Sequence, residues 1–114
     1  MEHAKNSEAD LQFSLAWALK QELGKNFYLD KFMGETQYGR AFVDVLVTDK
    51  LNTPELIIEL KMNSKIPSGE CDCNNVKLAQ YKKYCTFGIP IYTCNGYDDL
   101  EATLEYVKDN CSKD

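Results

Sequence analysis

Two apolar segments of this chain carry charged residues at positions where a buried strand normally has none. Asp44 interrupts the apolar run 41–47, and Glu59 and Lys61 interrupt the run 56–62. Burying an unpaired carboxylate or ammonium group costs several kcal/mol, so such groups normally pair or bind a metal ion. Because side chains alternate along a strand, Glu59 and Lys61 share one face. If the two runs are neighbouring strands, Asp44 lies near Glu59, and two carboxylates and an amine converge on the sheet.

This convergence has the chemistry of a magnesium site. Mg²⁺ prefers hard oxygen ligands and needs only one or two carboxylates besides a substrate phosphate. A bound ion stabilises charge on the phosphate and lowers the pKa of a bound water, which a nearby lysine can orient. The pattern therefore predicts a phosphodiesterase site in which Asp44 and Glu59 bind Mg²⁺ or Mn²⁺. In the competing interpretation, Glu59 and Lys61 are a solvated edge-strand pair and Asp44 is an ordinary strand carboxylate.

Periodicity and turn residues predict the elements around these strands. In chain order they are a helix over 7–23, strands over 27–33, 40–48 and 55–62, a polar loop over 63–74, a helix over 75–86, a strand over 89–94 and a final helix that Asp98 caps. Three successive strands favour a meander, and the strand–helix–strand order that follows favours a crossover. We therefore expect an α/β fold in which helices flank a central, mixed, four-stranded sheet. Phe13 and Trp17, four residues apart in the first helix, are expected in the core.

Length and composition limit the class of protein. The 114 residues are expected to form one domain, with 1–6 as a flexible tail. No apolar run is long enough for a membrane helix, and the N-terminus lacks the apolar stretch of a signal peptide, so we expect a cytoplasmic protein. The net charge of −5 argues against binding nucleic acid by bulk electrostatics, but allows a small basic strip. The candidates for such a phosphate-binding strip, which are otherwise a solvated surface, are Lys65, Lys77, Lys82 and Lys83.

The five cysteines are expected to be reduced, because their number is odd and no secretion signal is present. Cys71 and Cys73, in the polar loop, could join Cys85 or Cys94 in a zinc or iron–sulfur site. Their C-x-C spacing with scattered partners matches no standard pattern of such sites. Cys85 and Cys94 are therefore expected to be small core residues.

At the charged strands the sequence resembles the PD-(D/E)XK nuclease superfamily. Asp44 is followed, after fourteen intervening residues, by Glu59-Leu60-Lys61, with Val43 where the named motif has proline. Downstream, the stretch from Gln80 to Tyr84 is similar to the Q-x-x-x-Y motif of the RecB-type branch. The segments 39–44, 54–61 and 88–91 are most similar to the N-terminal nuclease domain of type I restriction-enzyme R subunits.

The resemblance implies a restriction-endonuclease-like fold and Mg²⁺-dependent hydrolysis of DNA. It implies that Asp44 and Glu59 bind the metal ion and that Lys61 assists the attacking water. Gln80 and Tyr84 would help to position the lysine, the metal waters or the phosphate; otherwise they form a half-exposed helix face. An acidic residue early in the first helix often completes such sites, and the candidates are Glu8, as the best match, and then Asp10 and Glu22.

Two other functions are compatible with the same residues. One is a catalytically inactive nuclease-fold module that binds a protein or nucleic-acid partner. The other is a structure-selective junction nuclease that acts as a homodimer. The two differ from a simple nuclease in Mg²⁺ binding and in preference for branched DNA, respectively.

Overall fold

The computed structural model describes residues 7–113, so the predicted flexible tail, residues 1–6, lies outside the described residues. In chain order the elements are α1 (Glu8–Gln21), β1 (Asn26–Thr36), β2 (Gly39–Thr48), β3 (Pro54–Lys61), β4 (Gly69–Glu70), α2 (Ala79–Cys85), β5 (Ile91–Asn95), the 3-10 helix η2 (Tyr97–Asp99) and α3 (Leu100–Asn110). The strands form a 5-stranded sheet in the order β1-β2-β3-β5-β4. The prediction of four strands is therefore wrong, because the 2 residues of β4 are too few to show a strand pattern.

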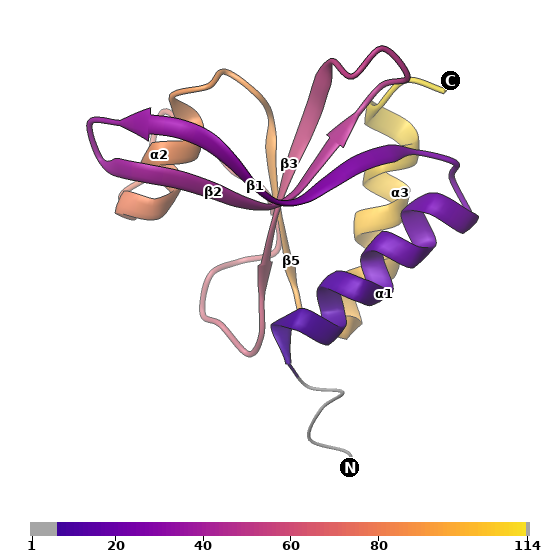
Figure 1. Cartoon of the computed structure of the whole chain (residues 1–114). Helices are drawn as coiled ribbons and strands as arrows, with labels where there is room; N and C mark the ends of the chain where they lie inside the picture. The colour runs from indigo at the N-terminus through magenta and orange to yellow at the C-terminus, as the bar shows by residue number, and fades with distance from the viewer. Residues whose placement is uncertain (1–6, 114) are drawn as a thin grey trace.

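The topology is a mixed α/β arrangement, as predicted. β1, β2 and β3 form an antiparallel meander, and β5 returns through α2 to lie parallel to β3. Figure 1 shows α1 and α3 on one side of the sheet and α2 on the other. The sheet is thus covered on both faces where its central strands lie.

Two hydrophobic clusters explain why the central strands are apolar throughout. One lies between the sheet and the α1–α3 layer and includes Leu15, Val45, Ile58 and Val107. The other lies beneath α2 and includes Ile57, Tyr81 and Tyr84. Because alternate side chains of β3 enter different clusters, a charged residue on the Ile57 face must find its polar partners on α2.

Helix α1 begins as the sequence predicts but exposes two aromatic residues that were expected in the core. Ser7 is the N-cap, and its hydroxyl accepts a hydrogen bond from the Asp10 amide at 3.0 Å. Phe13 and Trp17 are 73% and 70% exposed. Phe13 lies about 200° around the helix axis from the buried Leu11, so it points away from the sheet.

The two later helices are shorter than predicted. Asp98 lies in η2 rather than at the cap of α3, and Asp99 occupies the cap position without a side-chain hydrogen bond to it. Helix α2 covers 79–85 rather than 75–86. The Asp72 side chain accepts a hydrogen bond from the Asn74 amide in a turn, and the chain then stays irregular as far as Leu78, the extended N-cap of α2. No helix in the described part of the chain is long and apolar enough to cross a membrane.

The expectation of reduced thiols is also wrong in one place. Cys73 and Cys85 form a disulfide, which links the loop before α2 to the last residue of that helix. Cys85 is therefore half-buried rather than a simple core residue, whereas Cys94 is buried as expected. Cys71, Cys94 and Cys111 carry free thiols.

Candidate functional site

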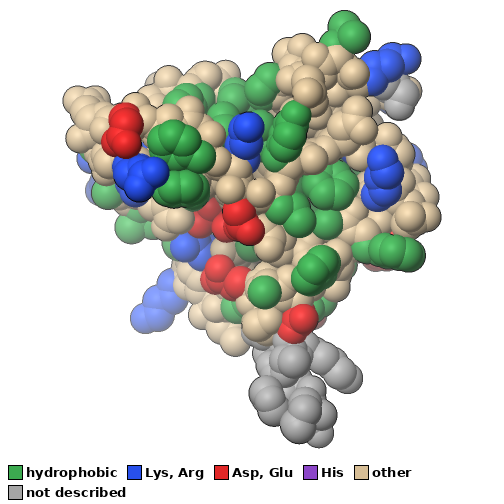
Figure 2. All heavy atoms as spheres, in the orientation of Figure 1, with side chains coloured by type: hydrophobic (Ala, Val, Ile, Leu, Met, Phe, Trp, Pro, Cys, Tyr) green, Lys and Arg blue, Asp and Glu red, His purple; other side chains and the backbone are tan. Residues whose placement is uncertain are grey.

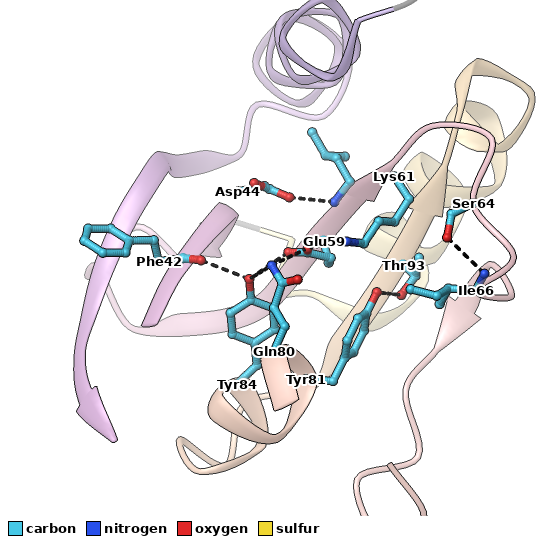
Figure 3. A network of polar contacts seen from close by, with 11 residues as sticks. Phe42, Asp44, Glu59, Lys61, Ser64, Ile66, Gln80, Tyr81, Tyr84 and Thr93 are labelled. Carbon is cyan, nitrogen blue, oxygen red and sulfur yellow. Dashed lines mark hydrogen bonds and ion pairs between the residues drawn. The ribbon is translucent and has the colours of Figure 1, made fainter. Parts of the chain in front are cut away.

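Glu59 and Lys61 extend from β3 toward α2, as their alternation along the strand predicts (Figure 3). Glu59 is only 2% exposed, and Lys61 is 22% exposed. The Lys61 Nζ lies 3.4 Å from Glu59 Oε2. Glu59 is therefore in the interior and Lys61 is partly open to solvent, whereas both members of an edge-strand pair would be exposed.

Asp44 lies where β2 and β3 separate. Their pairing begins beside the turn and ends at Val45 and Ile58, so the two strands diverge from there toward Asp44 and Glu59. In the gap, the Leu60 amide donates a hydrogen bond to Asp44 Oδ2 at 2.8 Å. One carboxylate oxygen thus replaces the backbone acceptor that a continued ladder would supply. Asp44 lies close enough to Glu59 for its negative charge to raise the pKa of the Glu59 carboxyl group.

Helix α2 supplies the polar partners of the buried Glu59 carboxyl group. Gln80 Nε2 donates to Glu59 Oε2 at 2.9 Å, and the Tyr84 hydroxyl donates to Glu59 Oε1 at 2.9 Å. Gln80 and Tyr84 are four residues apart, so they lie one above the other on the helix face that meets the sheet. Gln80 Nε2 also donates to the Tyr84 hydroxyl at 2.9 Å. The sequence-predicted pair therefore holds Glu59 from one side.

The Tyr84 hydroxyl has a further acceptor, the backbone carbonyl of Phe42, at 3.0 Å. A single hydroxyl proton cannot fully serve both Phe42 O and Glu59 Oε1. If Glu59 is protonated on that oxygen, it can donate to Tyr84, and the tyrosine proton is then left for Phe42. The hydrogen-bond network thus accommodates a protonated Glu59 without an unsatisfied group.

The electrostatics favour the same protonation state. Burial, followed by the negative charge of Asp44, raises the pKa of Glu59 to about 8. Burial also raises the pKa of Asp44. Two carboxyl groups face the one ammonium group of Lys61, so a negative charge remains for a proton or a second cation to balance. Asp44 and Glu59 are therefore the residues that could hold a divalent cation with a preference for carboxylate oxygens, such as Mg²⁺ or Mn²⁺.

The Tyr84→Phe variant should be destabilised by about 1–3 kcal/mol, because the Phe42 carbonyl loses its hydrogen-bond donor and the buried Glu59 Oε1 loses its hydroxyl partner. Urea unfolding followed by circular dichroism measures the change. Tyr28→Phe is the matched control, since Tyr28 is 37% exposed, and its stability should change by less than about 0.5 kcal/mol. Equal stability of Tyr84→Phe and the wild type would mean that the tyrosine hydroxyl makes no net contribution.

Gln12 in α1 also reaches the site, although the sequence does not predict it. Its Nε2 donates to the Asp44 carbonyl at 2.9 Å and to Asp30 Oδ1 at 3.1 Å. Glu8, the predicted third metal ligand, lies four residues earlier on the same face of α1, with an exposed side chain. Within residues 7–113, no third carboxylate joins Asp44 and Glu59 in a compact set of ligand atoms. A glutamine on an amphipathic helix gives no distinctive sequence signal, which explains why Gln12 was overlooked.

The four predicted phosphate-binding lysines fall in two places. Lys65 and Lys77 are exposed in the loop between β3 and α2. The Lys83 Nζ donates to the Arg40 carbonyl at 3.2 Å, and the Lys82 Nζ lies 5.8 Å from the centre of the Tyr38 ring. The last two therefore also hold α2 against the β1–β2 hairpin.

The loop that carries Lys65 is fixed at the end of β5. Asn95 Oδ1 accepts a hydrogen bond from the Ser64 amide, and Asn95 Nδ2 donates to the carbonyls of Ser64 and Ile66. Asn95 pairs with Lys61 across β3 and β5. The side chain of Asn95 thus sets the position of this loop relative to the site.

Comparisons with known proteins identify no relative of this chain. No family model matches it, and no curated protein or solved structure matches it either. The case for a function therefore depends on the geometry of the site and on the chemistry of its residues.

Proposed function

We propose that this chain is a metal-dependent nuclease domain that hydrolyses DNA phosphodiester bonds and has a restriction-endonuclease-like fold. The observation that carries the proposal is the meeting of Asp44, Glu59 and Lys61 at the point where β2 and β3 separate. The element order supports it as well: a helix precedes a three-stranded antiparallel meander, and a second helix leads to a strand parallel to the third. This order is the one that resemblance to the PD-(D/E)XK superfamily implies.

In this proposal Asp44 and Glu59 hold Mg²⁺ or Mn²⁺. The bound ion would stabilise negative charge on the phosphate and lower the pKa of a water. Lys61 lies beside Glu59 at the solvent side, where its ammonium group can orient the attacking water and offset the charge that develops on the phosphate. Glu8, on the same face of α1 as Gln12, is the candidate for a further ligand that acts through water.

Gln80, Tyr84 and Gln12 are positioning residues in this proposal. Gln80 and Tyr84 hold both oxygens of Glu59, which limits the orientations that its carboxyl group can adopt. Gln12 holds the backbone of Asp44 from α1. Two helices on opposite faces of the sheet therefore fix the two acidic residues, and a preorganised ligand pair loses less entropy on binding an ion.

The hairpin next to the site has features of a nucleic-acid contact surface. Phe32 and Phe42 are 43% and 49% exposed, and their ring centres lie 5.0 Å apart. The Arg40 guanidinium lies 5.1 Å from the first ring and 5.3 Å from the second. Exposed aromatic rings stack on bases, and arginine binds phosphate groups. In Figure 2, hydrophobic side chains are exposed on this hairpin, with acidic side chains near the centre of the same face.

Phe42→Ala should weaken the binding of a single-stranded oligonucleotide by about 5- to 100-fold, which is the loss of one base-stacking contact. Fluorescence anisotropy with Ca²⁺ in place of Mg²⁺ measures binding without cleavage. Phe13→Ala is the control, because Phe13 is even more exposed than Phe42 but lies on α1. The same affinity in wild type and Phe42→Ala would exclude the hairpin as a base-stacking surface.

The proposed activity is tested by incubating the protein with plasmid, linear duplex, single-stranded and branched DNA in Mg²⁺, in Mn²⁺ and in excess chelator. Cleavage that requires the metal ion supports a nuclease, and a preference for branched DNA supports the junction nuclease.

Calorimetric titration with Mg²⁺ distinguishes the inactive binding module. Wild type should bind Mg²⁺ in the millimolar range or tighter, and Asp44→Asn should bind it far more weakly; no Mg²⁺ binding and no cleavage would reject the enzymatic assignment.

A further inference from the structure

Three cysteines gather beside the C-terminal end of α2, where the loop that precedes the helix is linked to its last residue. Cys71 follows β4, Cys73 lies in the next turn, and Cys85 ends α2. Their sulfur atoms all lie within 4.8 Å of one another. Cys73 and Cys85 share a disulfide, with Cα atoms 5.7 Å apart, and Cys71 keeps a free thiol beside them. This set is separate from Cys94 and Cys111, which lie in the cluster between the sheet and the α1–α3 layer.

We propose that the reduced protein binds a zinc ion through the thiolates of Cys71, Cys73 and Cys85. Thiolates are soft ligands that favour Zn²⁺ over Mg²⁺. A tetrahedral site with Zn–S bonds of about 2.3 Å separates its sulfur atoms by about 3.8 Å. The three sulfurs are already gathered to nearly this spacing, so the main change is the opening of the bond between Cys73 and Cys85. Cys73 is exposed in a turn, where a rotation of its side chain is not blocked by core packing.

The turn that presents these cysteines is already ordered by other contacts. The Asp72 carboxylate accepts hydrogen bonds from the Asn74 amide at 3.1 Å and from Asn75 Nδ2 at 2.6 Å. The Cys71 amide donates to the Ile91 carbonyl at 2.9 Å, which fixes the start of the turn to β5. Breaking the disulfide would therefore leave Cys71 and Cys73 close together. A site that is ordered before binding loses less entropy when the ion arrives.

The ligand set has three protein members. Among the residues that the structure describes, no histidine, carboxylate or further cysteine joins the three sulfur atoms. The Asp72 carboxylate is directed into its own turn by both of its hydrogen bonds. Zinc would therefore keep a water molecule as its fourth ligand, which is the composition of an open rather than a closed site.

The disulfide and the zinc ion exclude each other. A dithiol reductant supplies two electrons and two protons to Cys73 and Cys85 and is itself oxidised to a disulfide. The resulting thiols and that of Cys71 then release their protons as the thiolates bind Zn²⁺. Because the three thiols must lose their protons to bind the ion, zinc binding should strengthen as the pH rises.

The disulfide-bonded and the zinc-bound protein would both have the loop before α2 linked to the helix that holds Glu59. Cys85 directly follows Tyr84, whose hydroxyl binds Glu59, and α2 has only 7 residues. A zinc ion would replace the covalent link when the protein is reduced. The position of Tyr84 would then be supported under both redox conditions. The zinc site itself does not depend on the proposed nuclease activity.

Cobalt titration tests the proposal, because Co²⁺ bound to thiolates gives a strong sulfur-to-metal charge-transfer absorption. The protein is reduced with a phosphine, which does not compete for the metal, and an Asp44→Asn background removes cobalt binding at the carboxylates. We expect saturation at one Co²⁺ per chain, displacement by Zn²⁺, and no charge-transfer band in the oxidised protein.

Cys71→Ser should weaken cobalt binding by at least about 100-fold, because two thiolates from one former disulfide make a poor site. Cys94→Ser is the matched control and should bind as the parent does, with circular dichroism confirming that both variants fold. The proposal is overturned by an absent charge-transfer band in the reduced parent, or by a band that Cys71→Ser retains or that Cys94→Ser abolishes equally.

Discussion

Replacing Lys61 with alanine should lower the rate of Mg²⁺-dependent DNA cleavage by about 100- to 1,000-fold, which is the usual loss for one charged group at a reacting centre. The ammonium group lies 3.4 Å from Glu59 Oε2 and is 22% exposed, so it can reach both the metal waters and a phosphate. Mg²⁺ binding should persist in this variant, because the two carboxylates remain and a nearby positive charge is removed. Single-turnover cleavage and calorimetry measure the two quantities separately.

Glu59→Gln should lose both Mg²⁺ binding and DNA cleavage. The substitution preserves the size of the side chain and removes one of the two carboxylates that the ion requires. Lys108→Ala and Glu105→Gln, both at exposed positions of α3, are the controls and should cleave DNA at the wild-type rate. If Lys61→Ala and Glu59→Gln were as active as these controls, the assignment of the reaction to this site would be wrong.

In the absence of metal, the stability of the protein should fall as the pH rises from about 5 to about 8. The pKa of Glu59 is about 8 in the folded protein, against a reference value of 4.5. Between these values the folded state holds a proton that the unfolded state has released, so unfolding becomes easier as the pH rises. The stabilisation that the Glu59 proton provides is complete below pH 4.5 and is lost above about pH 8. The slope should reach up to about 1.4 kcal/mol per pH unit.

Urea unfolding in excess chelator, repeated across this pH range, measures the slope. Glu59→Gln cannot ionise, and its stability should change far less with pH. Mg²⁺ should reverse the trend in the wild type, because the ion takes the place of the proton and stabilises the folded state by binding to it. Its apparent affinity should rise about tenfold per pH unit up to pH 8. A wild-type stability that does not change over this range, or the same slope in Glu59→Gln, would contradict a raised Glu59 pKa.

The arrangement of the acidic residues could be predicted because it follows from strand alternation. Glu59 and Lys61 are two residues apart in a strand, so they had to share a face, and a short turn between β2 and β3 brought Asp44 alongside. Gln80 and Tyr84 followed in the same way from helical spacing. The placement of these residues follows from their spacing within one strand or helix and from the pairing of strands that are consecutive in the chain. Both can be predicted from a single sequence.

Other parts of the site depend on contacts between distant residues. The Phe42 carbonyl that accepts from Tyr84 is a backbone group with no sequence signature. The link between Cys73 and Cys85 requires knowledge of how the loop before α2 folds back on the helix. The exposure of Phe13 has a different cause: its angle from Leu11 on the helix directs the ring away from the sheet, although its hydrophobicity favours the core.

The hydrogen bond between the Leu60 amide and Asp44 Oδ2 gives one side chain two tasks. With that oxygen committed to the protein backbone, Asp44 is expected to offer an ion only its other oxygen, so most of the coordination sphere is left for water and a phosphate. Selection on this residue is then twofold, since a shorter side chain would damage the closure of the sheet as well as the chemistry. A lineage that lost catalysis could for the same reason still retain an aspartate or asparagine at this position.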